Sequence, residues 1–225
     1  KERTRMNINK HLILLFSVLF FLFAVSVSSG CFRKNESDVK SVVRNELDQL
    51  KNLDSETTQK YIPYTELFPD ATENTDLTDE INETFSLFFR KFNYKISDVI
   101  VGTANHSATV SVKLTTIDSK VLARDFKAEL LRTQITESAQ AQKGNIKDSS
   151  RSLEAHYLIL NHLLNTNDYD TAETDCNIQL VNTGNDKKEK WKIQRTNSLE
   201  DDLVGGLIAD LANPDILSPE DTLTV

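Results

Sequence analysis

The chain has 225 residues, of which 39% are hydrophobic and 27% are charged, and its formal net charge is −8. This composition, with two cysteines, excludes a collagen, a disulfide-stapled miniprotein, a polytopic membrane protein and a wholly disordered chain. Residues 1–30 are basic, so the remaining residues carry 22 Lys and Arg against 33 Asp and Glu, a net charge of −11. We therefore predict no nucleic-acid partner for this acidic body.

The first segment has the pattern of an export signal. Residues 12–27 form an uncharged apolar run that follows four basic residues. As a helix with a rise of about 1.5 Å per residue, this run would reach roughly 24 Å, which is short of a hydrocarbon core of about 30 Å. Small residues follow at positions 28–30. We therefore predict a secretory signal peptide, helical in its apolar part, over residues 1–30.

Ser28-Ser29-Gly30-Cys31 resembles the lipobox of bacterial lipoproteins, in which a peptidase cleaves before a cysteine whose thiol carries a diacylglycerol. The usual motif has an aliphatic residue three positions before the cysteine, where this chain has Ser28, and Val27 lies one position further upstream. The resemblance implies lipid attachment at Cys31, a short linker over residues 31–36 and a location on the extracytoplasmic face of the cell membrane. Ordinary cleavage that releases a soluble protein, and an uncleaved anchor helix, are the alternatives.

After the linker, the spacing of apolar residues predicts a single α+β domain over residues 37–212. Gaps of three and four between apolar positions predict an amphipathic helix that begins at Ser37 as its N-cap and extends to Leu53. Residues 55–77 contain two prolines and many polar residues, so we expect a loop with short helical turns. A second helix is expected from Thr78, with a buried stripe made by Ile81, Phe85, Phe88, Phe89 and Phe92.

The period of the pattern changes from 3.6 to 2 near residue 93. Residues 94–101 and 108–116 are predicted to pair as a hairpin, and a loss of phase at Ser97-Asp98 predicts a β-bulge there. Helical spacing returns from Ser119, with an apolar stripe that extends to Ile135. A further helix is expected over residues 153–164.

A second hairpin and a last helix complete the predicted domain. Residues 171–181 alternate as a strand, and a short strand containing Trp191 follows a tight-turn signal at Gly184-Asn185. One helix is expected from Ser198, interrupted by Gly205-Gly206, and close packing against the sheet explains these glycines better than a hinge does. Residues 213–225 are predicted to form a flexible acidic tail.

Short connections force each pair of strands to run antiparallel, which excludes a parallel doubly wound sheet. We therefore predict an α+β fold. It consists of an antiparallel four-stranded sheet, made of two hairpins, with helices before, between and after the hairpins that cover one face of the sheet.

This order of elements resembles the cone-shaped fold of the nuclear transport factor two and ketosteroid isomerase family. Small clostridial-type lipoproteins of unknown function are similar through Tyr94-Lys-Ile-Ser-Asp-Val, Ala108-Thr-Val-Ser-Val-Lys, and the stretch from Trp191-Lys-Ile to Leu203-Val-Gly-Gly-Leu207. The resemblance implies a cone-like sheet. It carries over no catalytic residue, because the Asp base and the Tyr/Asp oxyanion pair of those isomerases cannot be placed in this sequence.

The sequence assembles no recognisable catalytic or metal-binding set. His156 and His162 lie six positions apart on one predicted helix, about 240° around its axis, so they cannot share a metal ion. Cys176 falls on the inward face of a strand, where a small apolar filler is favoured over a nucleophile. Gly-x-Ser-x-Gly, Cys-x-x-Cys and phosphate-binding glycine-rich motifs do not occur. We predict no catalytic residue, no metal and no cofactor.

Aromatic residues are concentrated in one stretch of the chain. Eight of the thirteen that follow Gly30 lie within 34 residues, namely Tyr61, Tyr64, Phe68, Phe85, Phe88, Phe89, Phe92 and Tyr94. In a cone fold this stretch would line the concave side of the sheet, so an apolar ligand pocket is one hypothesis, and a filled hydrophobic core is the favoured alternative.

These patterns together predict a non-enzymatic, membrane-tethered binding or interaction domain. Its expected partners are the membrane, through the lipid anchor, and a small apolar ligand or a protein. The alternatives are a structural spacer and an enzyme of the cone-fold class. A carboxylate with a strongly raised pKa, buried among the aromatic residues, would favour the enzyme.

Overall fold

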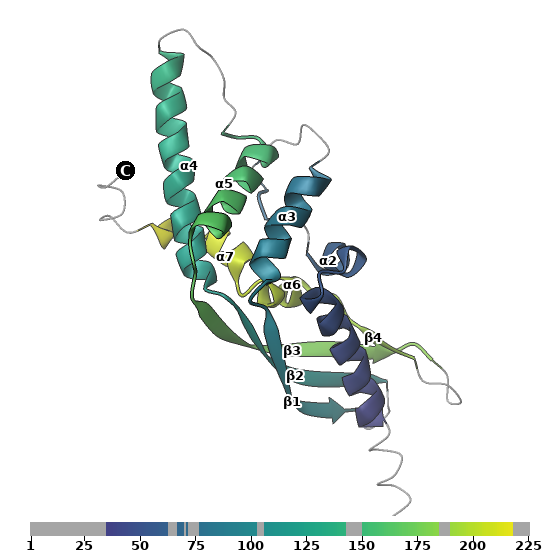
Figure 1. Ribbon diagram of the computed structural model, residues 1–225. Coiled ribbons are helices and arrows are strands. Elements are labelled where there is room, and N and C mark those ends of the chain that lie inside the picture. Colours follow the sequence, from purple (N-terminus) through teal and green to yellow (C-terminus); the bar gives the residue numbers. More distant parts are fainter. Residues whose placement is uncertain are drawn as a thin grey trace, which may run out of the picture.

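The computed structural model describes residues 35–62, 67–69, 71, 77–102, 106–142, 150–184 and 190–217, and the structural statements below concern these residues. The predicted signal peptide, Cys31, Tyr64 and most of the predicted acidic tail lie outside them. The described chain has helices before, between and after a four-stranded antiparallel sheet (Figure 1). The predicted α+β class is confirmed.

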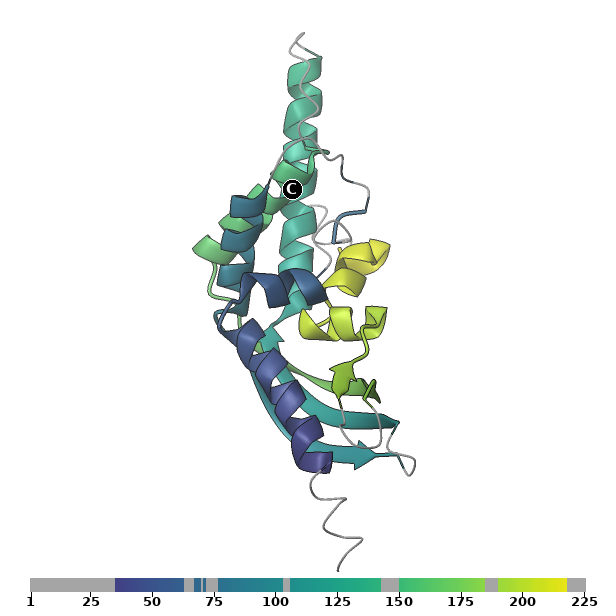
Figure 2. The same cartoon turned by 90° about the vertical axis from the view of Figure 1, so that its right-hand side faces the viewer.

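The sheet has the strand order β1-β2-β3-β4, and every neighbouring pair is antiparallel. The register of β1 on β2 shifts between Ile96 and Asp98, which confirms the predicted bulge. The two hairpins join through the long pairing of β2 with β3, and the strands bend along their length (Figure 2). The strand bounds are Asn93–Val101 for β1, Ser107–Ile117 for β2, Thr171–Asn182 for β3 and Trp191–Ile193 for β4.

The two faces of the sheet differ in polarity. On β2 the alternate residues Val110, Val112 and Leu114 are buried against the helices. On the opposite face, the Thr109 hydroxyl donates to the Gln179 side-chain oxygen at 2.9 Å. In the same way, the Ser111 hydroxyl donates to the Asn177 side-chain oxygen at 2.9 Å. The helices therefore cover one face of the sheet, as predicted, and the other face meets the solvent with polar side chains.

Three helices precede the sheet. The described part of the first covers residues 35–51 and buries Val39, Val43, Leu47 and Leu50 of the predicted apolar stripe. Leu53 lies beyond the helix and is 40% exposed, so the predicted extension to this residue is wrong. Ser37 lies inside the helix, so its prediction as the N-cap is also wrong. The second, α2 (Ser55–Tyr61), begins where the Asp54 carboxylate accepts from the Thr57 backbone N–H at 2.9 Å. The third, α3 (Thr78–Phe89), begins at the predicted residue, and Phe92 is buried just beyond its end.

Two helices fill the connection between the hairpins. The Asp118 side chain caps α4 (Ser119–Ala141) by accepting from two backbone N–H groups. The Ser152 side chain caps α5 (Leu153–Thr166) by accepting from one backbone N–H group. The buried residues of α4 end at Phe126, because its C-terminal half projects beyond the body of the protein (Figure 1). Ile135 is 53% exposed, so the prediction that the apolar stripe extends to it is wrong.

The predicted last helix is two helices. They are α6 (Asn197–Leu203) and α7 (Leu207–Ala212), and a 3₁₀ turn at Pro214–Ile216 forms the start of the predicted tail. Gly205 and Gly206 have φ angles of 68° and 89°, a left-handed conformation that ends a helix. A Cβ on Gly205 would lie 2.2 Å from the Thr116 hydroxyl on β2, so the predicted close packing on the sheet is confirmed for Gly205.

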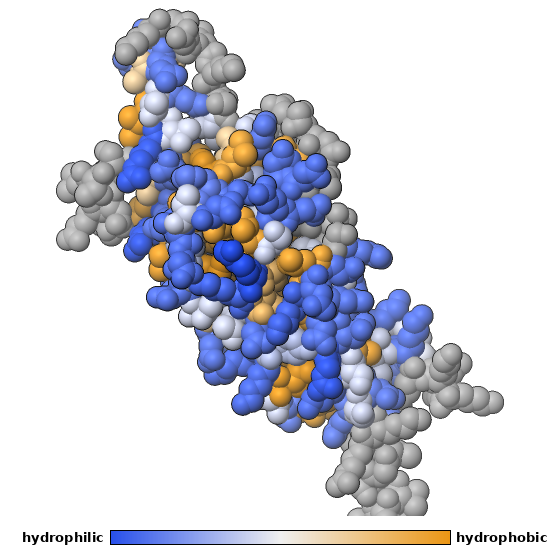
Figure 3. Space-filling view, viewed as in Figure 1, coloured by the Kyte–Doolittle hydropathy of each residue, from blue (hydrophilic) through white to orange (hydrophobic). Residues whose placement is uncertain are grey.

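The surface seen in Figure 3 is mainly hydrophilic, and its hydrophobic residues lie in several small groups, at the centre of the face, along its left edge and near its lower end. Large hydrophobic side chains that are exposed in the described chain are far apart in sequence, as with Ile100, Ile135 and Leu158. Isolated residues of this kind are normal on a folded protein.

Candidate functional site

Most of the aromatic residues predicted to line a pocket lie in the hydrophobic core. Tyr61, Phe85, Phe88, Phe89 and Phe92 are each at most 3% exposed. The ring centroid of Phe89 lies 5.4 Å from that of Phe88 and 5.2 Å from that of Phe92, in edge-to-face contacts. These rings therefore pack against one another, which is the arrangement expected of a filled core.

Two tyrosines of the same set have acidic neighbours. The Tyr94 hydroxyl on β1 donates to the Asp48 carboxylate on the first helix at 2.6 Å. Burial, and then this carboxylate, raise the pKa of Tyr94 to about 12. Burial, followed by the Glu46 carboxylate, raises the pKa of Tyr61 as well. Both phenols are protonated at neutral pH, so neither is an anionic nucleophile.

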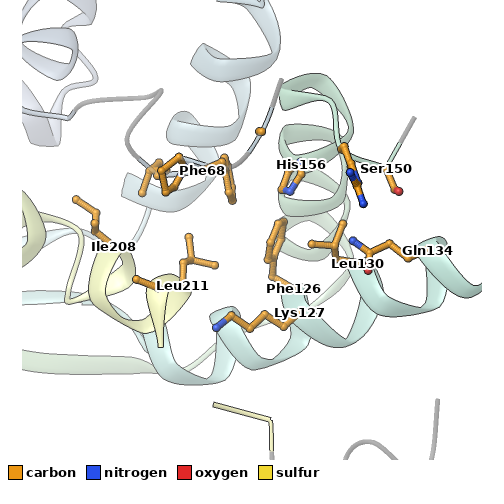
Figure 4. A pocket seen from close by; sticks show the side chains of 14 residues that line it. Phe68, Phe126, Lys127, Leu130, Gln134, Ser150, His156, Ile208 and Leu211 are labelled. Atoms are coloured by element: carbon orange, nitrogen blue, oxygen red, sulfur yellow. The ribbon is translucent and has the colours of Figure 1, made fainter. Parts of the chain in front are cut away.

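Phe68 lies at a different site, a cavity of about 570 Å³ between α4, α5, α7 and residues 67–69 and 71 (Figure 4). Its size falls within the range of about 300–1,000 Å³ that is usual for small-molecule sites. Of the predicted aromatic residues that the structure describes, which leaves out Tyr64, Phe68 is the one that lines it. The other lining residues are Leu67, Pro69, Ala71, Phe126, Lys127, Leu130, Gln134, Ser150, Arg151, His156, Ile208, Leu211 and Ala212.

Three rings, those of Phe68, Phe126 and His156, form one wall of this cavity, which we call the three-ring wall. The Phe68 centroid lies 5.1 Å from that of Phe126 and 4.9 Å from that of His156. The Phe126 and His156 centroids are 5.7 Å apart. His156 Nδ1 donates to the Ser152 carbonyl oxygen at 2.7 Å, because that oxygen can only accept. The ring is thereby fixed, and a ligand would meet its face or its Nε2 edge.

The described polar residues that line the cavity include bases but no acid. Lys127 and Arg151 are among the lining residues, together with Gln134, Ser150 and His156, and none of the lining residues described is Asp or Glu. The contrast is informative because the chain holds 34 acidic and 26 basic residues. In Figure 4 the side chain of Lys127 extends towards Leu211, while Gln134 and Ser150 lie on the opposite side, beyond Leu130.

Lys127 is tied to the end of α7. Its ammonium group donates to the carbonyl oxygen of Asn213, the residue that follows this helix. Burial lowers the pKa of Lys127, and the nearby Asp210 carboxylate acts in the opposite direction. The Asp210 carboxylate itself accepts from the Ser119 hydroxyl at 2.6 Å. Lys127 thus supplies a partly desolvated positive charge at the margin of an apolar space.

The thiol and the carboxylate whose pKa values are raised lie outside the cavity. Cys176 is buried on β3, and burial, with the neighbouring Asp202 carboxylate, raises its pKa to about 12. The thiol is therefore protonated at neutral pH and is not an activated nucleophile. Within the described chain, Asp202 is the carboxylate whose pKa is raised, by burial first, and it lies beside this thiol. Buried Glu200 pairs with Arg195.

The sequence alone did not indicate most of the cavity. Phe126 and Leu130 follow a helical stripe that predicts an ordinary core, and His156 was interpreted as a satisfied or solvated histidine. The one local signal was the spacing of Phe126, Lys127 and Leu130, which places a base beside an apolar stripe of α4. Only the folded chain brings these residues to Phe68 and Leu211.

Metal-ligating residues do not gather in the described part of the chain, where no group of three or more His, Cys, Asp or Glu could hold a metal ion. The helices of that part are all too short or too polar to cross a membrane. No protein-family model matches the chain, and neither does a curated protein or a solved structure. The pattern around Cys31 and the cavity are therefore the features from which a function can be argued.

Proposed function

We propose that the chain is a lipoprotein of the bacterial cell membrane whose α+β body binds a small, largely apolar ligand without transforming it. The anchor is supported by the basic start, the apolar run and the small residues that precede Cys31. A diacylglycerol on Cys31 provides two acyl chains, and at about 0.8 kcal/mol per buried CH₂ two chains give the durable anchoring that one does not. The described body begins at residue 35, a reach of at most roughly 14 Å from residue 31.

The cavity bounded by the three-ring wall is the observation that carries the binding half of the proposal. Its rings and the neighbouring leucines and isoleucine offer apolar surface, and each 100 Å² of apolar ligand surface removed from water contributes about 2.5 kcal/mol. The hydrogen bond to Ser152 already fixes the His156 ring, so a ligand that binds against this ring loses little affinity to ordering it.

The anchor is tested by replacing Cys31. When the full chain is expressed in a lipoprotein-processing bacterium, we expect radiolabelled palmitate to mark it, and Cys31→Ser to remove the label and release the protein from the membrane fraction. Cys176→Ser is the control, and it should keep both the label and the location. An unlabelled chain that remains membrane-bound would point to an uncleaved helix, and an unlabelled soluble chain to ordinary signal cleavage. Either result contradicts the proposed anchor.

Ligand binding is tested by filling the cavity. We expect the neutral fluorophore N-phenyl-1-naphthylamine to bind the full chain saturably, and Ala212→Trp to weaken this binding at least about tenfold, because the added indole occupies the cavity. Ala212 is exposed, so the substitution should leave the fold intact. Ala209→Trp is the matched control, since Ala209 is exposed on the same helix and does not line the cavity. Absence of saturable binding, or equal binding by both variants, would contradict the proposal.

A further inference from the structure

We infer that the ligand is an amphipathic anion, whose apolar body lies on the three-ring wall and whose acidic group meets the ammonium group of Lys127. This inference rests on the proposed function and specifies the chemical class of the ligand. It follows from three features of the cavity: its apolar wall, the absence of Asp and Glu among the lining residues that the structure describes, and the position of Lys127.

The apolar wall sets the body of the ligand. The Phe68 and Phe126 rings are stacked, with an interplanar angle of 28°, so they hold each other in place, and the parts of both rings that line the cavity are apolar. The Phe68 ring also meets Tyr157 edge-on at 5.3 Å, which holds it against α5. A planar or compact apolar group fits such a surface better than an extended polar chain does, because polar groups there would lose their hydration without gaining hydrogen bonds.

The charged lining residues set the sign of the charge. An anion brought into the cavity meets the ammonium group of Lys127, and none of the lining residues that the structure describes is Asp or Glu, although the Asp210 carboxylate lies near Lys127 outside the lining. A cation would meet the like charge of Lys127 in a partly desolvated space, where charges interact more strongly than in water. The rest of the chain is acidic, so its overall field repels anions, and the selection for an anion must come from the cavity itself.

Lys127 can accept the additional partner. A lysine ammonium has three donors, and in the structure one of them points to the Asn213 carbonyl oxygen. Within the described chain, Lys127 takes part in none of the ion pairs within 4 Å. In Figure 4 its side chain extends beside α4 towards Leu211. An acidic group at this margin would replace part of the hydration that burial has removed from the ammonium group.

Two probes with the same body separate the charge from the apolar surface. 1-Anilinonaphthalene-8-sulfonate and N-phenyl-1-naphthylamine share the anilinonaphthalene group, and only the first carries a negative charge. In fluorescence titrations of the full chain, we expect Lys127→Met to weaken binding of the sulfonate roughly tenfold and to change binding of the neutral probe by less than about twofold. Lys127→Arg, which keeps the charge, should retain most of the affinity for the sulfonate.

Lys120→Met is the matched control. Lys120 lies two turns earlier on α4, is exposed and does not line the cavity, so its replacement changes the net charge equally and should leave both titrations unchanged. If Lys127→Met leaves the sulfonate affinity unchanged while Ala212→Trp still blocks the neutral probe, the anion inference is wrong and the proposed binding function stands. If neither probe binds the wild-type chain, the proposed function fails, and the inference fails with it.

Discussion

Gly205→Ala should lower the free energy of unfolding by about 3 kcal/mol, because two separate penalties meet at this position. Gly205 has a φ angle of 68°, and an L-residue in the left-handed region costs roughly 1–2 kcal/mol. Its new Cβ would also lie 2.2 Å from the Thr116 hydroxyl oxygen, and overpacking of this kind costs about 1–3 kcal/mol. The change is measured as the shift in urea-induced unfolding followed by circular dichroism.

The neighbouring glycine separates the two penalties. Gly206 has a φ angle of 89°, but its added Cβ would come no closer than 3.7 Å to another residue, so Gly206→Ala should cost only about 1–2 kcal/mol. Thr116→Ala in the Gly205→Ala background removes the clashing oxygen and should restore part of the loss. Equal destabilisation by the two alanine substitutions would show that contact with β2 does not matter at this turn.

Phe89→Ala is expected to destabilise the protein by about 3–5 kcal/mol, the largest effect we predict for one side chain. Phe89 is 1% exposed, and its ring meets those of Phe85, Phe88 and Phe92 at centroid distances of 5.2–6.2 Å. Removal of the ring leaves a cavity that none of these neighbours can fill without leaving its own contacts. Equilibrium unfolding in urea gives the loss directly from the change in midpoint.

A surface leucine provides the comparison for Phe89. Leu158 on α5 is 53% exposed, so Leu158→Ala should change stability by no more than about 0.5 kcal/mol. Phe89→Leu keeps part of the volume and should fall between the two. A loss for Phe89→Ala close to that for Leu158→Ala would mean that the aromatic residues of α3 are not the centre of the core.

The elements that the sequence predicted well are those whose periodicity has a single physical cause. On β2, residues alternate between the helices and the solvent, so the positions of Val110, Val112 and Leu114 follow from a period of two. The bulge near Asp98 was visible because one extra residue reverses the phase of every residue after it. In the same way, the start of α3 at Thr78 followed from the acidic residues in its first turn.

The predictions that failed depended on what lies opposite a helix, which a local pattern does not contain. The stripe on α4 has the right spacing to reach Ile135, but this residue is 53% exposed, because the fully buried residues of the helix end at Phe126. The leucines of α6 and α7 keep helical spacing across Gly205, although the backbone turns there to bring the glycine against Thr116. Several polar residues near a helix start could serve as its cap, and Ser37 was the wrong choice.

The cavity was beyond sequence reasoning for a related reason. It draws Phe68 from the segment after α2, Phe126 from α4, His156 from α5 and Leu211 from α7. Each residue has a plausible role in its own segment, and only the way in which the helices pack decides that they enclose a space instead of filling it. The aromatic density near Phe68 pointed towards this region but not to its partners.

The pairing of β2 with β3 has a consequence for how the chain folds. Ile117 and Thr171 are partners in the ladder, and the backbone N–H of Asp118 donates to the Asp170 carbonyl at 2.9 Å, so the whole excursion through α4 and α5 begins and ends at one point. Each hairpin is closed by a short connection. Pairing of β2 with β3 must instead close a loop that contains the whole segment of α4 and α5, and the entropic cost of closing a loop rises with its length. Proteins dominated by such distant pairings are slow folders. The rate-limiting event in acquiring the native state is therefore expected to be the meeting of two preformed halves, with the helical excursion as the linker that they must bring together.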